Sequence, residues 1–279
     1  MQQRTVRATF QIAADGTQIG SWWAKLKRGS HHFELLKQDI VAWMDSLNGA
    51  PPWTVTRHFD PTLKAFVFSV HDFPDLPLEW GLQLGDILNN FRSALDHAAW
   101  HLANSESTPP LTPEKRRGVQ FPILDEQAKF PDAARRRLAG VPSNERAIIE
   151  RHQPFQNAAS PGSHPLALLR DLNDTDKHRQ IRLLALQHNL LDVRVTKHTD
   201  FFFANRVEVV NDCHLPLQMM HSGTESIRVY GVPVLGLHPD VEISFRAQFT
   251  IGVESGLLLD QIVVDIGNEI LSVLTDLGL

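Results

Sequence analysis

The sequence predicts an α+β protein: a helical bundle with an N-terminal β-hairpin, followed by a C-terminal antiparallel sheet capped by a helix. Three observations support this fold class. Apolar residues recur at helical spacing in several segments before residue 190, residues 241–253 alternate between apolar and polar, and helical spacing returns in residues 257–277. The change in character predicts two regions, residues 1–189 and 190–279, packed as one compact unit.

The first part of the chain predicts a long helix and then a hairpin. A helix is expected at residues 22–47, because their apolar side chains fall three and four positions apart on one face. Residues 53–59 and 65–70 have the pattern of two short strands, and the turn-favouring pair Asp60 and Pro61 lies between them. We therefore expect an antiparallel hairpin after the first helix.

Two further long helices are expected at residues 77–103 and 165–187. Pro77 suits the first turn of a helix, since the N–H group that proline lacks would have no partner there. The connection between the two helices begins with an irregular, proline-rich stretch and continues through short helices at residues 131–138 and 143–152.

The C-terminal region has a different pattern. Strands are expected through residues 190–253, and the alternation in residues 241–253 is typical of a strand with one buried face. Residues 257–277 return to helical spacing. This last helix is expected to cap the sheet or to dock on the other helices.

Composition limits the possible classes of protein. Hydrophobic residues make up 42% of the chain and charged residues 21%, as in globular proteins. No run approaches the roughly 20 apolar residues of a membrane-spanning helix, and the first 20 residues lack the apolar core of a secretory signal. We therefore expect a cytoplasmic protein without membrane contact. The single cysteine, Cys213, excludes an intramolecular disulfide.

The charge of the chain bears on its partners. A net charge of -5 argues against broad attraction to nucleic acid. Local basic patches remain open at Lys115–Arg117 and at Arg135–Arg137, although short charge runs are usually solvated faces.

Five polar residues of the helix at residues 77–103 share one face. At about 100° per residue they fall within a sector of about 80°, and they are Asp86, Asn90, Ser93, His97 and His101. Arg92 and Asp96 flank this sector on one side. Exposed helix faces usually carry Lys and Glu, whereas this face carries Asn, Ser and His. A functional face and an ordinary solvated face both remain open.

Polar residues also interrupt the apolar face of the helix expected at residues 165–187. Asn173, Asp176 and Gln180 stand where core residues are expected. A buried carboxylate without a partner is very costly, so Asp176 needs one. We expect the two helices to pack with their polar residues facing each other, either as a structural network or as a functional cleft.

Three segments carry a resemblance to a known group of proteins. They are residues 85–97 (GDILNNFRSALDH), residues 121–123 (FPI) and residues 173–179 (NDTDKHR). Together they resemble a family of uncharacterised bacterial proteins with the pattern N-x-RSALDH-x-x-W, FPI and N-x-x-DKHR. The resemblance covers roughly residues 85–182, and it implies no particular reaction.

Within the first segment, Arg92 to His97 also resembles the Arg-x(4–6)-His motif of HEPN ribonucleases. These are helical-bundle proteins that commonly dimerise and cleave RNA without a metal. This resemblance implies an endoribonuclease, related to toxin or defence systems, with RNA as partner and a homodimeric state. It also implies that no metal or cofactor takes part.

The ribonuclease hypothesis makes Arg92, Asp96 and His97 the catalytic residues. RNA cleavage without a metal needs a general acid or base with a pKa near neutrality and a cation for the phosphorane charge, which His97 and Arg92 would supply. Residues that would bind substrate or orient the imidazole are Asp86, Asn90, Ser93, Asn173, Asp176, Lys177, His178 and Arg179.

Two other classes of function remain open. A non-catalytic binding or regulatory protein, with residues 190–253 as its recognition surface, accounts better for the large β-rich region. The other class is a metal-dependent hydrolase, although the sequence contains no compact metal-binding motif such as His-Glu-x-x-His. Its ligands would come from the helical bundle, and they would be Asp86, His97, His101, Asp176 and His178.

Overall fold

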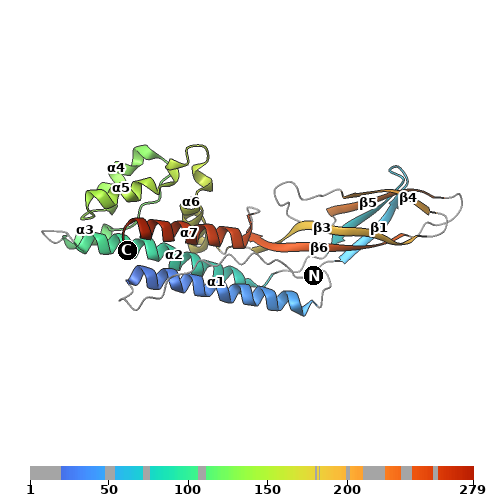
Figure 1. Cartoon of the computed structure of the whole chain (residues 1–279), viewed down its shortest axis with the longest axis horizontal. Helices are drawn as coiled ribbons and strands as arrows, with labels where there is room; N and C mark the ends of the chain where they lie inside the picture. The colour runs from blue at the N-terminus through green and yellow to red at the C-terminus, as the bar shows by residue number, and fades with distance from the viewer. Residues whose placement is uncertain are drawn as a thin grey trace. The chain divides into compact units, whose positions relative to one another are not determined.

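The protein belongs to the α+β class, with helices and antiparallel strands gathered in different units (Figure 1). The computed structural model describes residues 20–47, 54–71, 76–105, 111–179, 181, 183–198, 202–209, 224–233, 241–253 and 257–279. The helical unit comprises Met1–Asp39, Leu78–Ile181 and Asp260–Leu279, and the strand-rich unit comprises Ile40–Pro77 and Arg182–Leu259. The predicted domain division at residue 190 stays a prediction.

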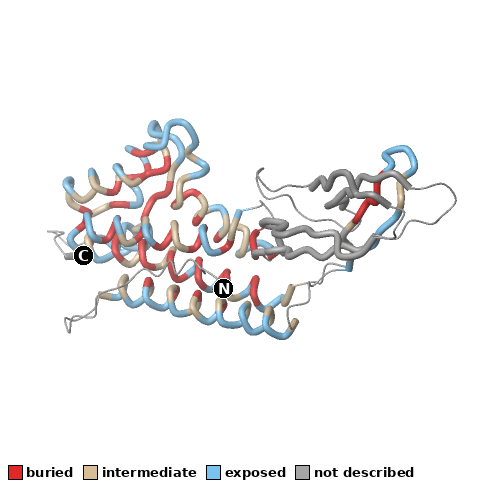
Figure 2. The backbone as a smooth tube through the Cα atoms, turned by 45° about the vertical axis from the view of Figure 1, so that its right-hand side comes forward, coloured by how far each residue is buried: buried red, intermediate tan, exposed pale blue. Residues whose placement is uncertain are grey.

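Three long helices contribute most of the core of the helical unit: α1 (Ser21–Ser46), α2 (Leu78–Ser105) and α7 (Leu259–Asp276). All three were expected from apolar spacing, and each turns buried residues inward, red in Figure 2. A Cβ atom at Gly29 would lie 2.6 Å from the Phe91 ring, so α1 and α2 approach closely there. No helix in the described part of the chain is long and apolar enough to cross a bilayer.

Shorter elements lie between α2 and β3 in the chain. They are α3 (Pro113–Gly118), η1 (Gln127–Lys129), α4 (Phe130–Arg137), α5 (Ser143–Arg151), η2 (Pro154–Gln156), η3 (Pro161–Ser163) and α6 (Pro165–His178). The sequence predicted α4 and α5, but it missed α3 within the proline-rich stretch. Thr112 caps α3 by accepting a hydrogen bond from the Lys115 N–H, and Pro113 occupies the first turn.

The helix predicted at residues 165–187 is wrong in its second half. α6 ends at His178, and Arg179 is extended, with φ -160° and ψ 156°. β3 (Leu183–His198) follows and pairs with β6 (Val241–Val253), Leu183 lying opposite Val253. The leucines of this segment suit helix and strand alike, and pairing with β6 selects the strand. Gln180, expected in the polar network, lies outside the described residues.

The strand-rich unit contains two antiparallel arrangements. One sheet has the order β1-β2-β5-β4, with β1 (Thr54–Asp60), β2 (Ala65–His71), β5 (Thr224–Pro233) and β4 (Phe202–Val209), and β3 pairs with β6. The predicted hairpin is confirmed, because β1 pairs with β2. The Asp60 carboxylate stabilises its turn by accepting hydrogen bonds from the N–H groups of Thr62 and Leu63, at 2.7 and 3.0 Å.

The C-terminal helix, α7, belongs to the helical unit for all but its first residue. Its buried residues recur at helical spacing as predicted, and they are Leu259, Ile262, Val263, Ile266, Ile270, Val273 and Leu274. The sequence left open whether this helix caps the sheet or docks on the other helices. Because α7 belongs to the helical unit, the structure supports docking on the other helices. That α7 also caps the sheet stays a prediction.

Candidate functional site

The polar stripe of α2 is partly exposed and partly buried. Asp86 and His101 are exposed, Ser93 and His97 are half-buried, and Asn90 is buried. The Asn90 side-chain amide donates a hydrogen bond of 2.8 Å to the backbone oxygen of Asp86 on the preceding turn of the same helix. Asn90 therefore satisfies part of its hydrogen-bonding capacity within α2.

Arg92 and Asp96 hold the backbone of Phe121 in a closed set of hydrogen bonds. Arg92 Nη2 donates to Asp96 Oδ1 at 2.9 Å and to the Phe121 backbone oxygen at 2.6 Å. The Phe121 N–H donates in turn to Asp96 Oδ1 at 2.9 Å. The side chains of Arg92 and Asp96 are 12% and 28% exposed. We call these three residues the Phe121 clamp.

Burial affects the protonation of the clamp. It raises the pKa of Asp96 above the ordinary value, while the positive charge of Arg92 and the Phe121 N–H group act in the opposite direction. The cation and the amide are therefore what keep a half-buried carboxylate ionised. Removing either partner would leave a charge with little compensation.

The chain following Phe121 is held from a second side by Gln153, which is fully buried. Gln153 Oε1 accepts a hydrogen bond of 3.0 Å from the Leu124 N–H. Its Nε2 donates to the backbone oxygens of Pro122 and Ile149, at 2.9 and 3.1 Å. No sequence motif singled out this glutamine, because its partners lie up to 31 residues away.

A third attachment of this segment comes from α6. Arg170 donates a hydrogen bond of 2.9 Å to Asp125, and it also bonds its neighbour Asp171. Residues 121–125 are thus fixed by α2, by Gln153 after α5 and by α6. The FPI segment is a junction in the helical unit.

α2 and α6 pack against each other at Gly85. A Cβ atom at Gly85 would overlap the Asp176 carboxylate, so this carboxylate lies directly against the backbone of α2. Burial, followed by the negative charge of Asp86, raises the pKa of Asp176. The expected approach of the two helices is therefore present, and it brings Asp86 and Asp176 together.

The same contact separates His97 from the residues expected to assist it. His97 lies twelve residues beyond Gly85 on α2, which corresponds to about 18 Å along the helix axis. Asp176 meets α2 at Gly85, so Asp176 cannot orient the His97 imidazole within one chain. The structure places these two predicted site residues at different levels of α2.

The remaining predicted residues of α6 occupy its C-terminal half and its end. Asn173 is buried, whereas Lys177, His178 and Arg179 are exposed. Lys177 Nζ pairs with Asp174 on the preceding turn at 3.3 Å. Within the described residues, no group of three or more His, Cys, Asp or Glu side chains is arranged to hold a metal ion.

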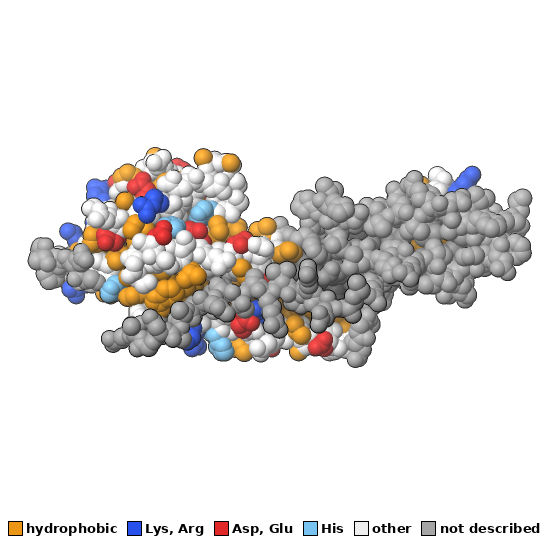
Figure 3. All heavy atoms as spheres, viewed as in Figure 1, with side chains coloured by type: hydrophobic (Ala, Val, Ile, Leu, Met, Phe, Trp, Pro, Cys, Tyr) orange, Lys and Arg blue, Asp and Glu red, His pale blue; other side chains and the backbone are white. Residues whose placement is uncertain are grey.

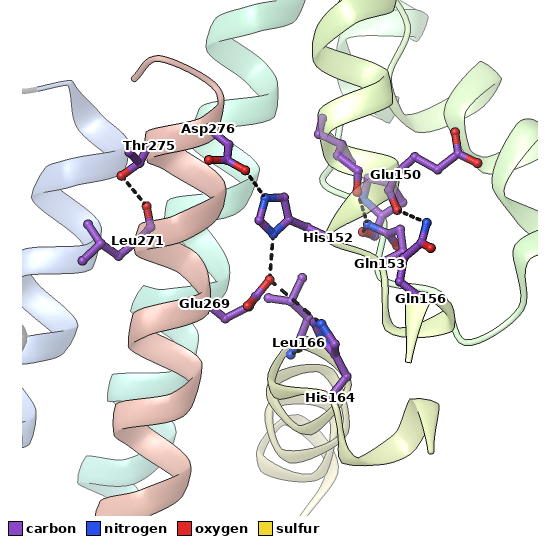
Figure 4. Close-up of polar contacts among 12 residues, drawn as sticks. Glu150, His152, Gln153, Gln156, His164, Leu166, Glu269, Leu271, Thr275 and Asp276 are labelled. Carbon is purple, nitrogen blue, oxygen red and sulfur yellow. Dashed lines mark hydrogen bonds and ion pairs between the residues drawn. The ribbon is translucent and has the colours of Figure 1, made fainter. Parts of the chain in front are cut away.

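A separate cluster joins α5, α6 and α7, and the sequence did not reveal it (Figure 4). The two ring nitrogens of His152 contact Glu269 and Asp276, at 2.8 and 3.0 Å. His164 Nδ1 accepts a hydrogen bond from the Leu166 N–H and caps α6, while its Nε2 lies 4.0 Å from Glu269. The two carboxylates lie 117 and 124 residues beyond His152, too far apart for a local motif.

The two histidines of this cluster are shifted in opposite directions. The hydrogen bond that His152 donates to Glu269, followed by the one it donates to Asp276, raises the pKa of His152, and burial lowers the pKa of His164. His152 is therefore stabilised as an imidazolium between two carboxylates. His164 is stabilised as the neutral ring that an accepting Nδ1 requires. Together they tie α5 and α6 to α7.

We expect His152 to make stability depend on pH. Because its folded pKa is raised above about 6.5, its stabilising effect is complete below that pH and is lost as pH rises through the raised value. Urea unfolding of wild type and His152→Gln should give free energies of unfolding whose difference shrinks as pH rises above about 6.5. His31→Gln, at an exposed position of α1, serves as the control. A constant difference between wild type and His152→Gln at every pH would contradict the assignment.

Comparison of the whole chain with protein-family models, curated proteins and solved structures gives no match in any of the three. The resemblances drawn from residues 85–97, 121–123 and 173–179 therefore stay expectations.

Proposed function

We propose that this chain is a non-catalytic binding or regulatory protein. The Phe121 clamp is the observation that carries the proposal. Arg92, the cation expected to stabilise a phosphorane, uses Nη2 for both Asp96 and Phe121. A cation acting in catalysis must be free to meet charge as it develops on the substrate. Withdrawing Arg92 from the clamp would leave the half-buried Asp96 poorly compensated.

The separation along α2 also supports the proposal. Asp176 is engaged at Gly85, about 18 Å of helix from His97. An acid or base in catalysis is normally oriented by a neighbouring group within hydrogen-bonding distance. In this proposal the helices form a bundle that serves as a scaffold in a cytoplasmic protein, and residues 190–253 supply the recognition surface.

A metal-independent ribonuclease is the second candidate, and His97 favours it. This ring is half-buried, and no hydrogen bond or ion pair within the described residues occupies its nitrogens. The positive charge of a protonated His97 acts to lower the pKa of Asp96, so the two groups lie within electrostatic reach of each other. His97 would act as the general acid or base on RNA, and a second copy of the chain would have to supply the cation.

One assay separates the two candidates. Purified wild type, His97→Ala and the exposed-site control His31→Ala are incubated with a labelled mixed-sequence RNA pool in EDTA. The proposal predicts the same background cleavage in all three samples. Cleavage by wild type and His31→Ala that disappears in His97→Ala would overturn the proposal and establish the ribonuclease. Activity seen only after divalent cations replace EDTA would favour a metal-dependent hydrolase instead.

A further inference from the structure

Two basic runs lie in neighbouring helices of the helical unit. The last turn of α3 carries Lys115, Arg116 and Arg117, and the last turn of α4 carries Arg135, Arg136 and Arg137. All six side chains are exposed. The two helices contain two carboxylates, Glu114 and Asp132, so this part of the surface is cationic although the chain carries a net charge of -5. We call the six residues the α3/α4 cationic patch.

The fold brings the two runs together at the ends of their helices. The Gln120 N–H donates a hydrogen bond of 2.9 Å to the backbone oxygen of Arg137. A Cβ atom at Gly118 would lie 3.4 Å from the backbone oxygen of Arg136. Figure 3 shows Lys and Arg side chains in blue over the end of the helical unit where Figure 1 labels α3 and α4. Runs that are separate in the sequence therefore form one surface.

Neighbouring carboxylates neutralise only part of the positive charge of the patch. Arg135 pairs with Asp132 at 2.7 Å, and Arg117 lies 4.0 Å from Glu114, both on highly exposed side chains. Such surface pairs contribute little, and they leave the guanidinium groups accessible. Lys115, Arg116 and Arg137 form no ion pair within the described residues.

A purely structural explanation accounts for part of the patch. Cations in the last turn of a helix interact favourably with the helix dipole, and the two short helices need one or two each. Six cations on adjacent helix ends exceed that requirement, and their mutual repulsion opposes it. A multivalent anion would relieve this repulsion.

We propose that the α3/α4 cationic patch binds the phosphate backbone of nucleic acid. The inference rests on the proposed binding function and adds to it a second surface, separate from residues 190–253, whose partner is nucleic acid. Five of the six cations are arginines, whose forked donors match phosphate oxygens. An anionic membrane fits less well, because binding in the bilayer interface also needs an exposed apolar face. α3 lacks large apolar side chains, and the large apolar side chain of α4, Phe130, is buried.

The test is fluorescence anisotropy of a labelled single-stranded RNA and of a DNA with the same sequence, titrated with the full chain over a range of salt. Arg116→Glu/Arg137→Glu reverses two charges in the patch. Lys27→Glu/Arg28→Glu reverses two exposed charges on α1 and has the same net charge. We expect salt-dependent binding by wild type, at least about tenfold weaker binding by the patch variant, and near-wild-type binding by the control. Losing two phosphate contacts should also lower the salt slope by about 1.4 for single strands.

Three results would overturn the inference: no nucleic-acid binding by wild type at low salt, equal loss in both variants, or binding to phosphatidylserine vesicles without binding to either nucleic acid. These results differ from failure of the proposed function. Patch-dependent binding together with His97-dependent cleavage in EDTA would keep the inference and overturn the non-catalytic proposal. Absence of both binding and cleavage would overturn the inference alone.

Discussion

Replacing Arg92 with alanine is expected to lower the free energy of unfolding by about 1.5 to 3 kcal/mol, the usual contribution of a hydrogen bond to a charged group, because the ion pair is only partly buried. The variant would leave the Asp96 carboxylate with the Phe121 N–H alone, and the Phe121 oxygen without its donor. Burial already raises the pKa of Asp96, so this carboxylate tolerates the loss of a cation poorly. Urea unfolding near neutral pH measures the change.

Arg135→Ala is the matched control for Arg92→Ala. Arg135 also pairs with an aspartate on its own helix, Asp132, at 2.7 Å, but the two side chains are 74% and 68% exposed. Exposed pairs of this kind are worth about 0.2 to 1 kcal/mol. If Arg92→Ala proved as mild as Arg135→Ala, the clamp would not stabilise the helical unit.

Replacing Gln153 with leucine is expected to lower the free energy of unfolding by about 2 to 4 kcal/mol. Leucine is similar in size, but it removes three hydrogen bonds and leaves the Leu124 N–H and the Pro122 oxygen unpaired in the interior. Buried polar groups that lose their partners cost about 1 to 3 kcal/mol each, and partial relaxation limits the sum. Thermal and urea unfolding both report the loss.

Gln156→Leu provides the comparison for Gln153→Leu. Gln156 Nε2 donates to the Glu150 backbone oxygen at 3.1 Å, and this bond is exposed (Figure 4). Water can replace it, so a change of less than about 0.5 kcal/mol is expected. Equal effects of the two substitutions would show that Gln153 does not hold the segment that follows Phe121.

The long helices could be predicted because their burial follows one period. In α1 and α2, residues such as Leu26, Phe33 and Phe91 face the core at helical spacing, and the first turn of α2 follows Pro77. The hairpin was equally readable, since Asp60 and Pro61 mark a turn within an alternating pattern. Both signals lie within the segment that they describe, so they can be read from the sequence of that segment alone.

Prediction failed where contacts distant in sequence decide the outcome. Leu183 to Gln187 extend the apolar spacing of α6, yet pairing with β6 draws them into β3. The failure at α3 was different in kind, because Thr112 and Pro113 are good N-terminal signals for a helix. The neighbouring prolines of the connection led us to predict an irregular stretch there instead of a helix.

The sequence identified residues of the candidate site, but it did not reveal what those residues do. Arg92 and Asp96 stood out beside the polar stripe, but their hydrogen bonds reach Phe121, 29 and 25 residues further along the chain. Spacing within one helix cannot reveal such partners. The cluster of His152, Glu269 and Asp276 was missed for the same reason.

The three segments that carry the family resemblance are in physical contact. The first segment, residues 85–97, holds residue 121 of the second through the Phe121 clamp. It also meets the third segment where Asp176 lies against Gly85. These contacts give the three segments a shared structural role, which requires no shared catalytic role.

A double-mutant cycle of Arg92→Ala and Asp96→Ala tests most directly whether these residues serve the structure. The free energies of unfolding of wild type, both single variants and the double variant give the coupling between the two side chains. The clamp predicts a coupling of at least about 1.5 kcal/mol, well above the 0.3 to 0.5 kcal/mol typical of exposed pairs one helical turn apart. A coupling near zero would contradict the structural role of the clamp, and a catalytic role for Arg92 would then be open again.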